Sequence, residues 1–195
     1  MQADTTGMRE QVTPVDLTAA PCERVLLMCE ALAGCGTLVL HGSNVRPVLQ
    51  TLEPRQANDR AKVSGNQCAV YASLDARVAL MYALLDRCYL SARLGSWRVA
   101  YCWQAGQLRF CVSDNLYQLF CNGDPALLSD GVVYVLERRR FVPAADSATE
   151  FHALLPQRPV HMLSVAATLG RELFYADGDA DGDAAGATVI RYPQT

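Results

Sequence analysis

The chain has 195 residues, of which 51% are hydrophobic and 19% are charged. This length and apolar content predict one domain that buries its own core without disulfide bonds or a metal ion, and they exclude a disordered protein. The formal net charge of −3 gives no sign of a protein that binds nucleic acids or membrane surfaces through its overall charge.

The first part of the chain predicts one helix, two strands and a loop. Residues 1–14 are polar and are expected to form a flexible N-terminus. Residues 21–33 predict a helix, because apolar residues recur on one face at helical spacing, a proline suits the first turn and a glycine follows the end. A strand is expected at 37–41 and, after a polar loop at 55–67, a buried strand at 68–72.

The remainder predicts a second helix and then mostly strands. Asp75 is expected to cap the helix, in which four side chains share one face: Val78, Met81, Tyr82 and Leu85. Strands are expected to follow at 96–103, 107–112, 132–136 and 159–165, the first two as a hairpin. The pattern predicts a single α+β domain over residues 15–174, with largely antiparallel strands, and an acidic Gly/Ala-rich tail at 175–195.

The cysteines show no metal-binding pattern. No two are spaced as C-x-x-C and none lies beside a histidine, so the sequence does not offer the short-loop ligands of a zinc site. Most lie in apolar runs, which predicts free thiols that act as small core residues: Cys22, Cys29, Cys35, Cys68, Cys88, Cys102, Cys111 and Cys121.

Three features bear on where the protein is found. Unpaired thiols fit a reducing compartment. Residues 1–11 lack the basic region and apolar run of a signal peptide, and every apolar stretch is far shorter than the roughly 20 residues of a membrane-spanning helix. We therefore expect a cytoplasmic protein with no membrane partner, and we leave secretion as an effector open.

Three short segments combine residues that can carry chemistry. LVLHGS at 38–43 is a strand that ends in a histidine, AVYAS at 69–73 is a strand with a tyrosine, and TEFHALLPQRPVHMLSV at 149–165 places one glutamate before the final strand. Taken one at a time, each favours an ordinary structural role: a hydrogen-bonded His41, a packed Tyr71 and a solvated Glu150.

Taken together and in this order, the segments resemble the His-Tyr-Glu ADP-ribosyltransferases, which include diphtheria-toxin-like and poly(ADP-ribose)-polymerase-like enzymes. A closer resemblance is to small bacterial proteins of this superfamily, because LEPRQA at 52–57 and YVLERRRF at 134–141 also match their pattern. The resemblance covers residues 36–165. It implies split antiparallel β-sheets with flanking helices, and NAD⁺-dependent mono-ADP-ribosyl transfer with release of nicotinamide.

The resemblance also implies roles for individual residues. Breaking the bond between ribose and nicotinamide passes through an oxocarbenium-like state, which a carboxylate stabilises, and Glu150 takes this catalytic role. His41 would hold the ribose by a hydrogen bond, and Tyr71 would stack on nicotinamide.

Four further residues complete the NAD⁺-binding set that the resemblance implies. Gly42 would leave room for the nicotinamide amide to pair with the main chain, and Arg55 would meet the pyrophosphate, with a surface ion pair as an equal alternative for this arginine. Ser43 and Ser73 would form supporting hydrogen bonds. The resemblance implies no metal.

The partners implied are NAD⁺, a protein or nucleic-acid acceptor, and a cognate antitoxin or immunity protein if the enzyme is a toxin, effector or defence factor.

Two departures from the family matter: Phe151 stands where a tryptophan is common, and Ala148 removes the E-x-E pair of arginine-modifying toxins. Two alternatives stay open. One is an inactive NAD- or nucleic-acid-binding relative, and the other is a tRNA 2′-phosphotransferase-like enzyme.

Three other signals favour ordinary structure. Residues 177–182 match the first half of a calcium loop, but its twelfth position is Thr188 and not glutamate, so a solvated linker is favoured. The arginines at 138–140 favour a solvated strand end over contact with an anionic partner. His152 and His161 are not at metal-ligand spacing.

Overall fold

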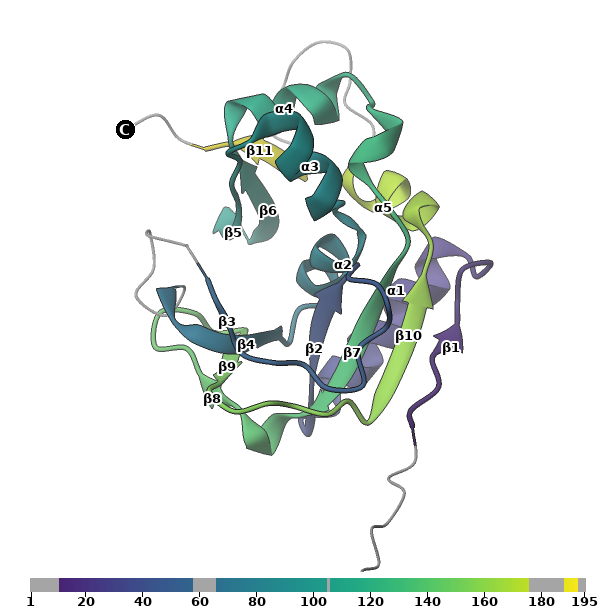
Figure 1. Ribbon diagram of the computed structural model, residues 1–195, viewed down its shortest axis with the longest axis vertical. Helices are drawn as coiled ribbons and strands as arrows, with labels where there is room; N and C mark the ends of the chain where they lie inside the picture. Colours follow the sequence, from purple (N-terminus) through teal and green to yellow (C-terminus); the bar gives the residue numbers. More distant parts are fainter. Residues whose placement is uncertain (1–10, 58–65, 105, 176–187, 193–195) are drawn as a thin grey trace, which may run out of the picture.

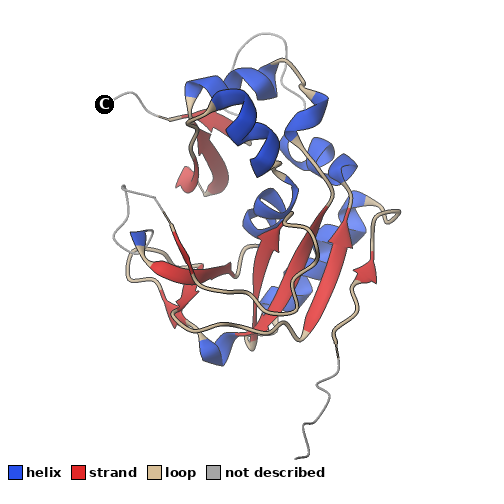
Figure 2. Ribbon diagram, in the orientation of Figure 1, coloured by secondary structure: helices blue, strands red, loops and turns tan. Residues whose placement is uncertain are grey.

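The computed structural model describes residues 11–57, 66–104, 106–175 and 188–192. These residues form two β-sheets and the helices that pack on them, so the predicted α+β class is confirmed (Figures 1 and 2). Both sheets are mixed and not purely antiparallel, because an edge strand of each is parallel to its neighbour.

The larger sheet has eight strands among the described residues, in the order β1-β10-β7-β2-β4-β9-β8, with β3 paired to β4. Figure 1 shows β4 and β9 running away from the β2–β7–β10 part of the sheet. The strands are β1 Val15–Asp16, β2 Leu38–Ser43, β3 Arg55–Gln56, β4 Cys68–Ser73, β7 Gly131–Glu137, β8 Val142–Pro143, β9 Glu150–Ala153 and β10 His161–Val165.

The smaller sheet has the order β11-β6-β5. Its strands are β5 Val99–Gln104, β6 Gln107–Val112 and β11 Val189–Arg191, so the predicted hairpin of β5 and β6 is present. β11 comes from the segment expected to be a tail, and its pairing with β6 shows that residues 189–191 belong to the fold. The calcium-like motif at 177–182 lies outside the described residues.

Five α-helices lie in the described part of the chain: α1 Cys22–Gly34, α2 Ala76–Leu84, α3 Arg87–Leu94, α4 Asp114–Cys121 and α5 Ala167–Phe174. The first two were expected, and the last three were not. Short 3₁₀ turns lie at Pro125–Leu127 and Arg138–Arg140. No helix in the described ranges has both the length and the apolar character needed to cross a bilayer.

The predicted cap of α2 is present. The Asp75 carboxylate accepts hydrogen bonds from the main-chain N–H groups of Arg77 at 2.8 Å and Val78 at 3.2 Å. These bonds satisfy donors that have no partner in the first turn of a helix. The cap fixes where β4 ends and α2 begins.

One face of the larger sheet packs against α1, α2 and α5. Leu40, Val133 and Val135 point into this core, together with residues of the small sheet such as Phe110. The other face buries a second core, in which Val39 and Tyr134 meet side chains of β4 and β9. Alternate side chains of β2 therefore point into different cores.

Helix α2 lies against the backbone of the larger sheet. A Cβ atom added at Gly42 on β2 would come within 1.8 Å of the Ala79 carbonyl oxygen, and one at Gly131 on β7 within 1.8 Å of the Ala83 carbonyl oxygen. Only glycine permits this approach, so the two glycines let the helix backbone pack directly on the strands.

The thiols are free, as expected, but most do not serve the core. Cys29 and Cys111 are buried, whereas Cys22 and Cys102 are half-buried and the rest are exposed. The expectation of core thiols is therefore wrong for most of them. Apolar neighbours in the sequence did not predict burial, because a strand turns only alternate residues inward and a helix turns only one face inward.

The segment before β1 is held to the fold at Val12. Its main-chain N–H donates to the Gln50 side chain at 3.0 Å, and the Gln50 amide donates back to the Val12 carbonyl at 3.1 Å. The expected flexible N-terminus therefore does not extend to Val12, and residues 1–10 lie outside the described residues.

Candidate active site

The three segments singled out in the sequence lie on three neighbouring strands, β2, β4 and β9. Leu40 of β2 is opposite Ser73 of β4, and Ser73 is opposite Glu150 of β9. His41, Tyr71 and Glu150 therefore lie within one or two residues of a single row across the sheet. The structure makes neighbours of three strands that are far apart in the sequence.

Tyr71, Ser73 and Glu150 share one face of β4 and β9, because paired residues and alternate residues point the same way. Tyr71 is half-buried. Its hydroxyl donates to the Gln67 carbonyl at 3.0 Å and accepts from the Gln67 N–H at 3.0 Å. These two bonds anchor the phenol and fix the ring in one orientation.

His41 lies where β2 and β4 separate. The ladder between these strands contains a single residue pair, Leu40 with Ser73. The next residue, His41, is paired on its other side with Tyr134, and the two rings lie 6.1 Å apart, so its side chain leaves the face that carries Tyr71. The Nδ1 atom of His41 nevertheless reaches the Tyr71 carbonyl oxygen at 2.6 Å.

This contact determines the protonation of the imidazole. A carbonyl oxygen can only accept, so Nδ1 carries a hydrogen and Nε2 of the neutral ring is an acceptor. Burial lowers the pKa of His41 to about 4, the bond to Tyr71 opposes this, and the charges of Arg87 and Arg55 lower it further. His41 is thus a neutral histidine whose Nε2 atom is of the acceptor type.

We expect His41 to make the protein less stable in mild acid. The pKa is about 4 in the folded protein against an ordinary 6.5, so the unfolded chain takes up a proton first. The contribution to stability is complete above pH about 6.5 and is lost as the pH falls toward 4. Urea unfolding at pH about 7.5 and about 5 should show a smaller loss of stability for His41→Gln than for the wild type.

The exposed His161 provides the control, and His161→Gln should lose as much stability between the two pH values as the wild type. An equal loss in wild type and His41→Gln would show that His41 is not held neutral by the fold.

Glu150 is the first residue of β9 and receives a hydrogen bond from the other sheet. The Tyr101 hydroxyl, on β5, donates to the Glu150 Oε2 atom at 3.0 Å. Burial raises the pKa of Tyr101 to about 12, so the phenol keeps its proton and remains a donor. The main-chain N–H of Glu150 donates to the Ser147 hydroxyl at 3.2 Å. The Tyr101 bond therefore holds the carboxylate, and the Ser147 bond holds the backbone of the same residue.

The sequence did not reveal the role of Tyr101. It lies 49 positions from Glu150, in a strand whose apolar neighbours indicate only core packing. The available signal was weak: a tyrosine in a buried strand needs a partner for its hydroxyl.

Replacing Tyr101 with phenylalanine is expected to lower the free energy of unfolding by about 1.5–3 kcal/mol, the range for hydrogen bonds to charged groups. Urea unfolding measures the change. In a Glu150→Gln background the same substitution should cost less, because the amide oxygen is a weaker acceptor than a carboxylate. Equal costs in both backgrounds would mean that the bond to Glu150 contributes nothing.

A glycine is required at position 42 for a different reason from the one expected. The space that its missing side chain leaves is filled by the backbone of α2, with the Ala79 carbonyl oxygen 1.8 Å from a Cβ position. The expectation that this space serves a ligand is therefore corrected: the glycine is needed for helix packing. Its main-chain groups lie beyond the single residue pair of β2 with β4.

The two serines form local bonds at the ends of their strands. The Ser43 hydroxyl accepts from the Val45 N–H at 3.2 Å, and the Ser73 hydroxyl accepts from the Asp75 N–H at 2.9 Å. Each bond tightens the turn that follows its strand. Ser73 on β4 is also directly opposite Glu150 on β9.

Positive charge reaches this region from two arginines. Arg55 is exposed on β3, which pairs with β4 at Ala69, two residues before Tyr71. Arg87, at the start of α3, packs over the Tyr82 ring at 5.4 Å. Both lower the pKa of His41, so both guanidinium groups act on its imidazole. Arg87 was not singled out, because no sequence motif surrounds it.

His152 is a further residue of this face. It is directly opposite Tyr71 and two residues after Glu150. Its Nδ1 atom is buried and has no hydrogen-bond partner in the structure. An unpaired buried nitrogen is unfavourable for folding.

We compared the chain with protein-family models, with curated proteins and with solved structures, and none of the three comparisons found a match.

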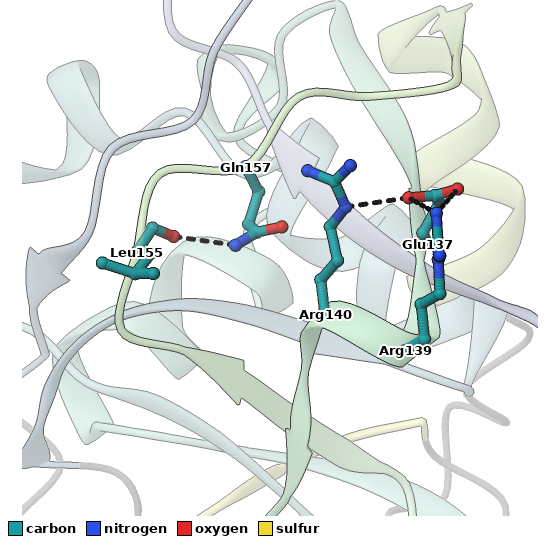
Figure 3. A network of polar contacts seen from close by, with 5 residues as sticks. All are labelled: Glu137, Arg139, Arg140, Leu155 and Gln157. Carbon is teal, nitrogen blue, oxygen red and sulfur yellow. Dashed lines mark hydrogen bonds and ion pairs between the residues drawn. The ribbon is translucent and has the colours of Figure 1, made fainter.

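The three consecutive arginines are used within the molecule. Arg139 and Arg140 form ion pairs with Glu137 at 3.0 Å and 2.8 Å, as Figure 3 shows. Arg138 packs over the Phe151 ring at 4.8 Å. Beside this network, the Gln157 amide donates to the Leu155 carbonyl at 2.9 Å. These contacts favour the solvated strand end over an anionic partner.

Proposed function

We propose that this protein is an NAD⁺-dependent mono-ADP-ribosyltransferase with an ADP-ribosyltransferase-like split β-sheet. The observation that carries the proposal is the row formed by β2, β4 and β9, with Glu150 held by a hydrogen bond from the opposite sheet. The His-Tyr-Glu resemblance of the sequence also supports the proposal.

Glu150 supplies the catalytic group in this proposal. As the bond between ribose C1′ and nicotinamide breaks, positive charge develops on the ribose, and a fixed carboxylate stabilises it more in the transition state than in the ground state. The Tyr101 hydroxyl keeps the carboxylate in one orientation. Nicotinamide leaves with the electron pair of the broken bond, and the acceptor then bonds to C1′ and gives up its proton to solvent.

The remaining residues bind NAD⁺. The neutral His41 offers Nε2 as an acceptor for a ribose hydroxyl, and the anchored Tyr71 ring offers a surface for nicotinamide. The exposed Arg55 guanidinium suits pyrophosphate oxygens. Gly42 contributes through its main chain, past the point where β4 leaves β2. NAD⁺ is the substrate, and the mechanism uses no metal.

The acceptor is a protein or a nucleic acid. Ala148 stands two residues before Glu150, where arginine-modifying toxins carry a second acidic or amide residue, so arginine side chains are not the acceptor we propose. We propose that the enzyme acts as a toxin, effector or defence factor, with a cognate antitoxin or immunity protein as its partner.

The test is incubation of the protein with NAD⁺ labelled in the adenosine half, with and without a bacterial lysate. We expect nicotinamide release, measured by chromatography, and transfer of label to protein or nucleic acid. NAD⁺ binding by calorimetry without release over hours would favour an inactive binding module. Transfer that requires a 2′-phosphorylated RNA would favour a tRNA 2′-phosphotransferase-like enzyme. Absence of NAD⁺ binding would reject the proposal.

A further inference from the structure

Two cysteines on neighbouring strands of the small sheet lie in direct contact. The Sγ atoms of Cys102 on β5 and Cys111 on β6 are 3.2 Å apart. The ladder pairs Cys102 with Arg109 and Cys111 with Ala100, so the two cysteines occupy a diagonal position on one face. A disulfide bond is roughly 2.05 Å long, so the sulfur atoms need to approach by little more than 1 Å.

The two thiols differ in access. Cys102 is half-buried and Cys111 is buried. Burial raises the pKa of Cys111, which keeps this thiol protonated and unreactive toward reagents in solution. Cys102 is therefore the sulfur that a reagent meets first, and Cys111 is placed to react with it afterwards.

We propose that Cys102 and Cys111 form a reversible disulfide by exchange with a low-molecular-weight disulfide of the glutathione type. The Cys102 thiolate attacks the reagent's disulfide, and one glutathione thiolate leaves. Cys111 then loses its proton and attacks the Cys102 sulfur, and the second glutathione leaves. The protein is oxidised by two electrons, and one glutathione disulfide is reduced to two thiols.

The position of the pair explains why the bond would be reversible. Diagonal residues of an antiparallel ladder are farther apart than directly opposite ones, so the strands must shift slightly when the bond closes. Strained disulfides are the more easily reduced ones. The strand would shift next to Tyr101, which precedes Cys102. The Tyr101 hydroxyl is the group that holds Glu150.

The test uses the full-length Cys121→Ser variant, because trypsin then releases the two cysteines on separate peptides, 99–109 and 110–138, with no other cysteine in either. After treatment with glutathione disulfide and blocking of free thiols, mass spectrometry should find these peptides joined. Excess reduced glutathione should separate them again. The mass-spectrometric result does not depend on NAD⁺ or on the proposed function.

Two variants sharpen the result. Added Cys111→Ser should leave a lasting glutathione adduct on Cys102, because the resolving thiol is gone, whereas added Cys35→Ser, at an exposed site, should leave the link unchanged. The proposal is overturned if Cys102 keeps its glutathione adduct when Cys111 is present. It is also overturned if Cys102 joins other cysteines as often as Cys111.

Discussion

Replacement of Glu150 by glutamine is expected to slow nicotinamide release from NAD⁺ by about 100- to 1,000-fold, the range for loss of one preorganised electrostatic group. The amide has nearly the shape of the carboxylate and can still accept the bond from Tyr101, but it has no charge to stabilise the oxocarbenium-like state. Chromatography of released nicotinamide under single-turnover conditions measures the effect.

The same variant should remain folded and should bind NAD⁺ with a Kd within about threefold of the wild type, since the lost interaction belongs to the transition state. Glu30→Gln is the matched control, because Glu30 is an exposed residue of α1. It should release nicotinamide at the wild-type rate. A Glu150→Gln protein as active as the wild type would show that the catalytic role is wrongly assigned to this carboxylate.

The second large effect is expected at Gly42. A Cβ atom there would lie 1.8 Å from the Ala79 carbonyl oxygen and 2.5 Å from the Ala83 nitrogen, and both atoms belong to the backbone of α2. A backbone cannot rotate away as a side chain can, so the helix must move off the sheet. Gly42→Ala is expected to lose at least about 3 kcal/mol of unfolding free energy, at the upper end of overpacking effects.

Urea unfolding of Gly42→Ala and Gly34→Ala provides a matched comparison. Gly34 ends α1 and has no atom within 4 Å of a Cβ position, so its replacement should be neutral or slightly stabilising. If Gly42→Ala is as stable as the wild type but fails to bind NAD⁺, the space at Gly42 belongs to the ligand and not to the helix.

The strongest sequence signals predicted their elements well. β2, β4 and β7 are apolar runs, and the Asp75 cap is a local interaction of neighbouring residues. Such features depend on a few residues in a row, so a sequence reveals them. The missed helix α4 also had a signal, because Leu116, Leu119 and Phe120 recur at helical spacing.

Other elements had little local signal. Helix α3 fully buries only Leu90, while Tyr89 and Leu94 are partly buried, so its sequence RCYLSARL gives only a weak helical pattern. The four residues of β9 are too few to show alternation. β11 has three residues and is a strand because β6 provides a partner. These elements form because the rest of the fold supplies a surface for them.

The candidate site divides in the same way. The sequence offered His41, Tyr71 and Glu150 from motif order, but it could not show that their strands are neighbours. The bond from Tyr101 to Glu150 and the contact between Cys102 and Cys111 are side-chain meetings across strands or sheets. Such side-chain contacts depend on strand register, and a slip of one residue would abolish them.

Length and composition by themselves determined a single domain of near-neutral charge with a core of its own, because length and apolar content set how much surface can be buried. The sequence also determined eight thiols without a metal pattern. Only the tertiary structure decided that Gly42 serves α2, that most thiols are not core residues, and that Tyr101 reaches Glu150. Burial and contact are properties of the packed chain, and no residue carries them alone.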